Sequence, residues 1–88
     1  MGDGRRLVGW NLRRIRVRRG YSIERLAGDA DVDSSHVARI ERGTVNSSID
    51  VLDRLAGVLE VRLSDLFRQP PPGAKPPPPL RSGRRPKG

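Results

Sequence analysis

The sequence of 88 residues contains no cysteine, a single histidine, and one residue each of tryptophan, tyrosine and phenylalanine. Without thiolates or a second histidine, it lacks the side chains from which disulfide frameworks and zinc sites are built. No apolar run approaches the length that crosses a bilayer, and the arginine-rich start lacks the apolar stretch of a secretory signal. We therefore expect a cytoplasmic protein without a metal, a cofactor or a membrane contact.

Catalytic machinery is also lacking. A chain of 88 residues forms one small domain with a modest core, which leaves no room for a deep cleft and its supporting scaffold. The only histidine, His36, lies at the start of a predicted helix next to serines and aspartates, and this arrangement alone does not make a catalytic triad. We expect no enzymatic activity.

Proline is absent from the first 69 residues, and all eight prolines lie in the segment "PPPGAKPPPPLRSGRRPKG" that begins at Pro70. This proline-rich and basic composition cannot form a packed core. We predict a folded domain at residues 5–68 and a disordered, basic, proline-rich tail at residues 69–88. The tail could serve as a solubilising end, a nonspecific phosphate-binding arm or a ligand for a proline-recognition domain.

The net charge of +8 is unevenly distributed. Seven arginines and no acid occur from Arg5 to Arg19, whereas residues 20–69 contain nine acidic residues against six arginines. Residues 70–88 carry five basic residues and no acid. Such a balance favours a polyanionic partner, although the basic segments flank the middle of the predicted domain.

Apolar residues recur at helical spacing, and no segment shows sustained strand alternation, so the predicted fold class is all-α. Capping residues divide the pattern into five helices. The first ends at Gly20, Ser22 caps the second, Asp33 caps the third, Ser48 caps the fourth, and Ser64 opens a short fifth through "SDLF". Gly43 tolerates the left-handed conformation that ends the third helix.

Several motifs occur in a fixed order: "RGYS", then "LA", "ARIERG", "SIDVLDRLAGVLEV" and "LSDLF". In this order they resemble the phage-repressor/Cro (Xre) type of helix-turn-helix family, from Leu12 to Phe67. The resemblance implies a compact five-helix, repressor-like domain. It also implies that helix three, at about residues 33–42, lies in the major groove of DNA.

The resemblance assigns roles to individual residues. Base-reading positions correspond to Ser34, Ser35, His36 and Arg39. Phosphate-binding positions correspond to Ser22, Ile23, Arg42, Thr44 and Asn46. Two further positions, Arg16 and Glu41, match a structural ion pair between helices.

Some residues depart from the family pattern. Ile23 replaces a common glutamine, so only its backbone N–H can reach a phosphate. Asp31 replaces the usual turn glycine, but aspartate tolerates a left-handed backbone. Together with Asp29 and Asp33 it puts negative charge near the start of the recognition helix, and this charge opposes phosphates.

Two functions are consistent with these features. The first is a sequence-specific transcriptional regulator that binds a palindromic, double-stranded DNA operator as a homodimer, with helix four or five at its interface. The second is a protein-binding antiactivator or antitoxin-like adaptor that keeps the fold but captures another regulator protein instead of DNA, with Trp10 as a possible anchor. Steep salt dependence and a sequence preference in DNA titrations would favour the first.

Overall fold

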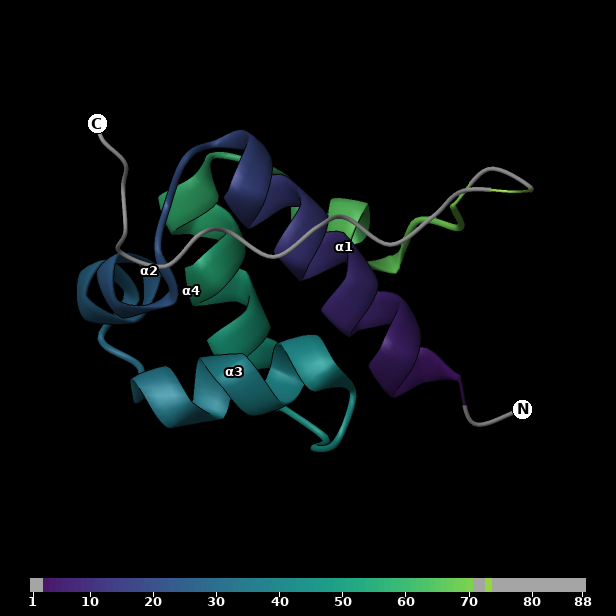
Figure 1. The fold of residues 1–88 in the computed structure, drawn as a ribbon, viewed down its shortest axis with the longest axis horizontal. Helices are drawn as coiled ribbons and strands as arrows, with labels where there is room; N and C mark the ends of the chain where they lie inside the picture. Colours follow the sequence, from purple (N-terminus) through teal and green to yellow (C-terminus); the bar gives the residue numbers. More distant parts are fainter. Residues whose placement is uncertain (1–2, 71–72, 74–88) are drawn as a thin grey trace.

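The computed structural model describes residues 3–70 and Gly73. Its elements are α1 (Gly4–Arg18), α2 (Ile23–Ala30), α3 (Ser34–Arg42), α4 (Ile49–Leu59) and a 3₁₀ helix, η1 (Leu63–Phe67) (Figure 1). The described residues contain no strand, which confirms the all-α class. None of the described helices combines the length and apolar character needed to cross a membrane.

The expected fifth helix differs from the prediction. It is a 3₁₀ helix that begins at Leu63, so a count of five α-helices is not confirmed. Ser64 does not cap it; instead the Asp65 carboxylate accepts a hydrogen bond from the Arg62 N–H at 2.9 Å. A five-residue segment is short enough for the tighter 3₁₀ geometry, which serves mostly in short connecting pieces.

The division of the chain into a domain at 5–68 and a tail at 69–88 stays a prediction. Apart from Gln69, Pro70 and Gly73, the tail lies outside the described residues.

Side-chain capping bonds set the starts of α2 and α4. The Ser22 hydroxyl accepts from the Arg25 N–H at 3.0 Å, and the Ser48 hydroxyl accepts from the Val51 N–H at 3.1 Å. These bonds satisfy backbone donors that have no partner within the first turn of a helix. Asp33 occupies the cap position of α3, but its side chain makes no capping bond to the backbone.

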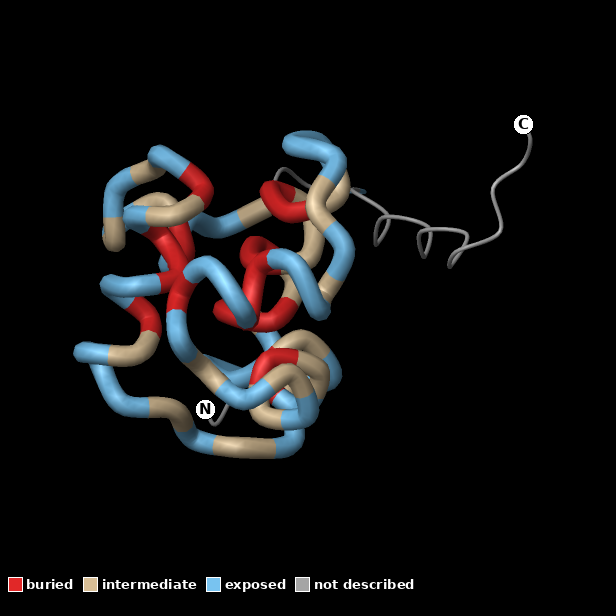
Figure 2. Tube along the Cα trace, turned by 90° about the vertical axis from the view of Figure 1, so that its left-hand side faces the viewer, coloured by how far each residue is buried: buried red, intermediate tan, exposed pale blue. Residues whose placement is uncertain are grey.

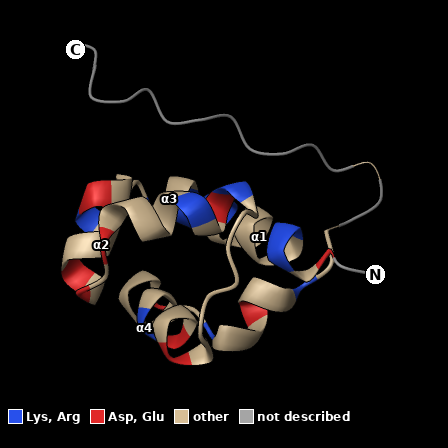
Figure 3. Cartoon of the chain, turned by 90° about the horizontal axis from the view of Figure 1, so that it is seen from below, with Lys and Arg blue, Asp and Glu red and all other residues tan. Residues whose placement is uncertain are grey.

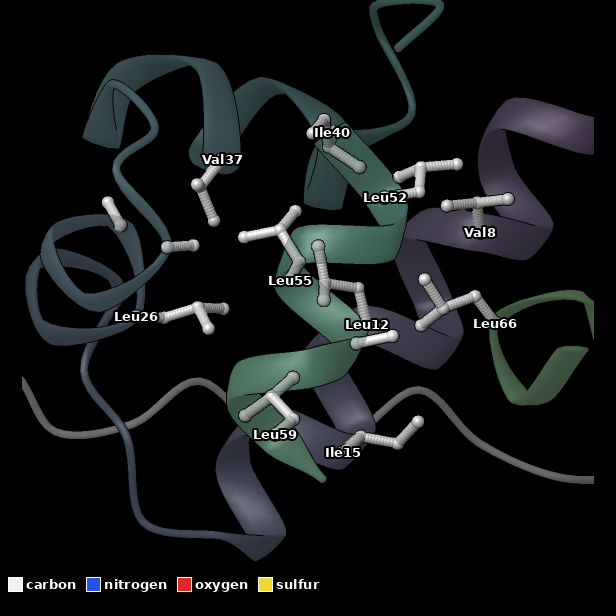
Figure 4. Packing of buried hydrophobic residues seen from close by; sticks show 13 residues of the cluster. Val8, Leu12, Ile15, Leu26, Val37, Ile40, Leu52, Leu55, Leu59 and Leu66 are labelled. Carbon is white, nitrogen blue, oxygen red and sulfur yellow. The ribbon is translucent and has the colours of Figure 1, made fainter. Parts of the chain in front are cut away.

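The core forms where α1, α2, α3, α4 and η1 meet (Figure 4). Fully buried leucines come from four of these elements: Leu12, Leu26, Leu55 and Leu66. Buried segments point toward the interior of the domain, while exposed segments form its outer turns (Figure 2). On α1 the core contacts are made by Val8, Leu12 and Ile15, whereas Leu7, which also belonged to the predicted apolar stripe, is only half-buried.

Candidate nucleic-acid interface

The turn between α2 and α3 depends on one left-handed residue. Asp31 has φ of 58° and ψ of 48°, as its tolerance for this conformation predicted. The Asp31 N–H donates to the Gly28 carbonyl and the Val32 N–H to the Ala27 carbonyl, so the last carbonyls of α2 are satisfied. The chain then changes direction and starts α3, which lies along one edge of the domain (Figure 1).

An exposed stripe runs along the outer face of α3. Ser35, Arg39 and Arg42 are exposed at spacings of four and three residues, whereas Val37 and Ile40 face the core. Among the described residues, neither the Arg39 nor the Arg42 guanidinium takes part in an ion pair or a side-chain hydrogen bond. Both cations are therefore available to an external anion or base edge.

The other predicted base-reading residues are less open. Ser34 and His36 are half-buried, and the His36 Nε2 lies 3.2 Å from the Ser47 hydroxyl, so this ring faces the loop before α4. The Ser35 hydroxyl donates to the Asp33 carboxylate at 3.0 Å, which leaves its lone pairs as acceptors. Half-buried Ala38 also lies beside the stripe. The sequence analysis did not include it among the candidate base-contacting residues, because its methyl group has no polar atom.

The predicted phosphate-binding residues separate into two groups. Arg42 and Asn46 are exposed, and Ile23 is the first residue of α2, where backbone N–H groups lack intrahelical partners. The Ser22 hydroxyl is already bonded to the Arg25 N–H. Thr44 donates both its N–H, at 3.1 Å, and its hydroxyl, at 3.2 Å, to the Arg39 carbonyl, and it therefore caps α3 and keeps no donor for a phosphate.

Arg16 and Glu41 form an ion pair between α1 and α3. The Arg16 Nε lies 2.5 Å from Glu41 Oε2, and its Nη2 donates to Oε1 at 2.9 Å. The Arg16 Nη1 also donates to the Tyr21 carbonyl at 2.8 Å. Only 5% and 6% of the two side chains are exposed, so the pair is buried and bidentate and holds the C-terminal half of α3 against α1.

A close approach between α1 and α3 escaped the sequence analysis. A Cβ at Gly9 would lie 2.7 Å from the Glu41 carbonyl oxygen and nearer still to that of Ile40. Gly43 ends α3 with φ of 73°, and the side chain of Arg6 lies directly beside it. An isolated glycine in a helical pattern was the only available signal for Gly9. The basic start of α1 consequently borders the end of α3.

The acidic residues near the interface have structural partners or roles. Asp29 lies 3.9 Å from Arg25 in an exposed (i, i+4) pair, Asp31 forms the turn, and Asp33 accepts from Ser35. Figure 3 shows acidic segments on α2 and α4, and basic segments on neighbouring parts of α3 and α1. Within residues 3–70, no three histidine, aspartate or glutamate side chains gather in an arrangement that could hold a metal ion.

Two helices joined by a tight turn, the second with an exposed basic stripe, define a helix-turn-helix domain. The chain belongs to the helix-turn-helix family HTH_3, whose family model matches residues 12–66. This result confirms the resemblance inferred from the motifs.

Relatives and solved structures agree with this family. The HTH-type transcriptional regulator SlrR of Bacillus subtilis is 40% identical over 62 residues, which are 69% of this chain and 41% of SlrR. The chain thus spans less than half the length of that relative. The structure of the restriction-modification controller protein C.AhdI from Aeromonas hydrophila is similar with a TM-score of 0.70 and 35% identity, covering 72% of this chain and 96% of C.AhdI.

SinR is a further relative. The N-terminal DNA-binding domain of this biofilm regulator from Bacillus subtilis is similar with a TM-score of 0.61 and 34% identity, over 69% of this chain and 90% of that domain. SinR has also been solved in a complex with the SinI protein. This chain is similar to a chain of that complex with a TM-score of 0.66 and 34% identity, over 68% of this chain and 59% of the matched chain.

Proposed function

We propose that the chain is a sequence-specific, DNA-binding transcriptional regulator that inserts α3 into the major groove of an operator. The observation that carries this proposal is the exposed stripe of Ser35, Arg39 and Arg42, in which both guanidinium groups lack an intramolecular partner among the described residues. Arginine at such a position can bond the two acceptors of guanine in a bidentate manner. The protein acts by binding, in the cytoplasm, and not as an enzyme.

The surrounding groups meet the DNA backbone. Arg42 and Asn46 bind phosphates on one side of α3, and the Ile23 N–H at the start of α2 binds a phosphate on the other side. Arg6 adds a positive charge beside Gly43. Thr44 is omitted from this set because both of its donors are bonded to the Arg39 carbonyl. Phosphate contacts fix the register, whereas Arg39 and Ser35 read bases.

Two copies of the chain meet on a palindromic operator through an apolar groove of about 370 Å³. Ile49 and Phe67, the large hydrophobic residues that are exposed in the described part of the chain, both line this groove. Ile40 at the end of α3 lines it too, so a second copy seated there brings the two α3 helices to either side of one two-fold axis.

Substitutions on α3 test the mode of binding. Arg39→Ala should cost roughly 1–3 kcal/mol at the specific site and relax the preference at one base pair. Arg42→Ala should weaken binding to all sequences similarly, because a phosphate contact carries no base information. Arg62→Ala is the control, since Arg62 follows the C-terminal end of α4, which points away from α3 (Figure 1). Equal affinities for all four proteins in DNA titrations would refute the proposal.

Substitution of the groove tests the dimer. Ile49→Asp together with Phe67→Asp should abolish cooperative binding to a palindromic site while leaving affinity for a single half-site nearly unchanged. Sedimentation of the free and DNA-bound protein measures the assembly state. Unchanged cooperativity in the double variant would place the contact between copies elsewhere.

The alternative function is capture of a regulator protein instead of DNA. It is supported by the solved complex of SinR with SinI, in which a relative of this chain binds a protein. Amide-shift mapping with duplex DNA and with candidate regulators separates the two functions: shifts on α3 with DNA favour the regulator, and a protein complex without any DNA response favours the adaptor.

A further inference from the structure

Helix α1 carries a second apolar face in addition to the one that packs in the core. Leu7, Trp10 and Val17 are half-buried, yet none belongs to the core cluster or to the half-buried residues packed against it. With Arg14 they follow spacings of three, four and three residues, which gathers the four side chains within roughly 80° of the helix circumference. We call these four residues the tryptophan seam.

Positive charge borders the tryptophan seam on both sides. By helical position, Arg6 and Arg13 lie along the edge nearer α3, and Arg18 lies along the edge nearer η1. No acidic residue occurs between Arg5 and Arg19. Arg14 stands over the Trp10 ring with its guanidinium carbon 5.3 Å from the ring centroid, so the seam combines an aromatic surface with a half-buried cation.

Among the described residues, no acidic side chain forms an ion pair with an arginine of this surface. The Nε atoms of Arg13 and Arg14 are buried and have no hydrogen-bond acceptor among the described residues. The Asn11 side-chain oxygen lies 3.5 Å from the Arg14 Nη2, a long contact. Burial, followed by the charges of Arg18 and Arg68, lowers the pKa of Arg14, and Asp65 only partly opposes this effect. A carboxylate of a partner at the Nη atoms of these guanidinium groups would supply the missing negative charge.

We propose that the tryptophan seam binds an amphipathic helix of a partner protein whose apolar residues are flanked by glutamate or aspartate. Spacings of three and four residues are those with which one helix packs against another, and a central tryptophan beside an arginine is a typical binding hot spot. Acidic flanks on the partner complement the arginines on both edges of the seam.

Other occupants fit less well. A second copy would bring two arginine-rich edges together, and the segment from Lys75 to the end of this chain is itself basic. DNA held by α3 would approach from the side of Gly9, which lies roughly a third of a turn around α1 from the centre of the seam. The partner helix and an operator could therefore bind the same protein together. This inference does not rest on the proposed DNA binding.

A designed peptide provides the test. Three heptads with leucine at positions a and d and glutamate at e and g do not pair with themselves at neutral pH, because the glutamates repel. Titrated into the full chain, this peptide should shift the emission of Trp10, the only tryptophan, to shorter wavelength and move the amide signals of α1. The same peptide with lysine in place of glutamate should bind at least about tenfold more weakly. A DNA duplex should not displace the glutamate peptide.

Charge-reversed variants localise the binding. Arg14→Glu should weaken the glutamate peptide about tenfold, whereas Arg54→Glu, the same charge change at an exposed site on α4, should alter its affinity by less than about twofold. If Arg14→Glu lowers the thermal midpoint of the domain, Arg18→Glu is used in its place. The proposal is overturned if both peptides bind equally or if neither binds. It is also overturned if the amide shifts are confined to α3 or to the groove beside Phe67, or if DNA displaces the glutamate peptide.

Discussion

Replacement of Arg16 by alanine should destabilise the domain more than removal of any exposed arginine. The substitution deprives the Glu41 side chain, which is 6% exposed in the intact pair, of its bidentate partner, and it removes the hydrogen bond to the Tyr21 carbonyl. Breaking a buried pair by deleting one member typically costs ~3–5 kcal/mol, because the remaining charge stays desolvated. In a domain of this size that cost lowers the thermal midpoint by roughly 12 °C or more.

Arg19→Ala is the matched control. Arg19 lies 3.6 Å from Glu60, but 43% and 79% of these side chains are exposed, so solvent screens the pair and its loss costs at most ~1 kcal/mol. Both variants keep the chain length and lose one arginine from the same end of α1. Urea titration followed by circular dichroism gives the two free energies of unfolding, with the slope checked for a common denatured state.

A double substitution separates the pair from the packing around it. Arg16→Met combined with Glu41→Leu fills a similar volume without charge and should recover most of the lost stability. The double variant should also bind DNA, because the ion pair positions α3 and is not itself part of the proposed interface. If Arg16→Ala and Arg19→Ala destabilise the protein equally, the argument from burial is wrong.

Two further perturbations test the close helix approach and the tail. Gly9→Ala should lower the free energy of unfolding in a urea titration by ~1–3 kcal/mol because the added Cβ meets the backbone of α3, and an unchanged midpoint would contradict the close approach. Gly28→Ala is the control: its Cβ has open space around it, and the substitution should stabilise α2 by ~0.5–1 kcal/mol. Deletion of residues 70–88 should leave the unfolding midpoint nearly unchanged and reduce nonspecific DNA affinity through the loss of five basic residues, and a loss of cooperative unfolding would refute this expectation.

The positions of the α-helices could be predicted from the sequence because the determinants are local. Ser22 and Ser48 bond backbone groups three residues away. Asp31 adopts a left-handed conformation that aspartate tolerates, and Gly43 adopts one because glycine has no Cβ. The partnership of Arg16 with Glu41, by contrast, came from the family resemblance. Nothing in the local chemistry of either residue specifies a partner 25 positions away.

Tertiary structure alone decided the contacts between distant segments. Asn11 is fully buried and donates to the Leu66 and Arg68 carbonyls, 55 and 57 residues along the chain, and so ties η1 to α1. His36 faces Ser47, and both donors of Thr44 bond the Arg39 carbonyl of α3. Fewer of the predicted residues are therefore free to contact DNA than the sequence suggested. The seam around Trp10 likewise emerged only when the core was known, because residue spacing cannot tell which of two apolar faces on one helix the rest of the chain will cover.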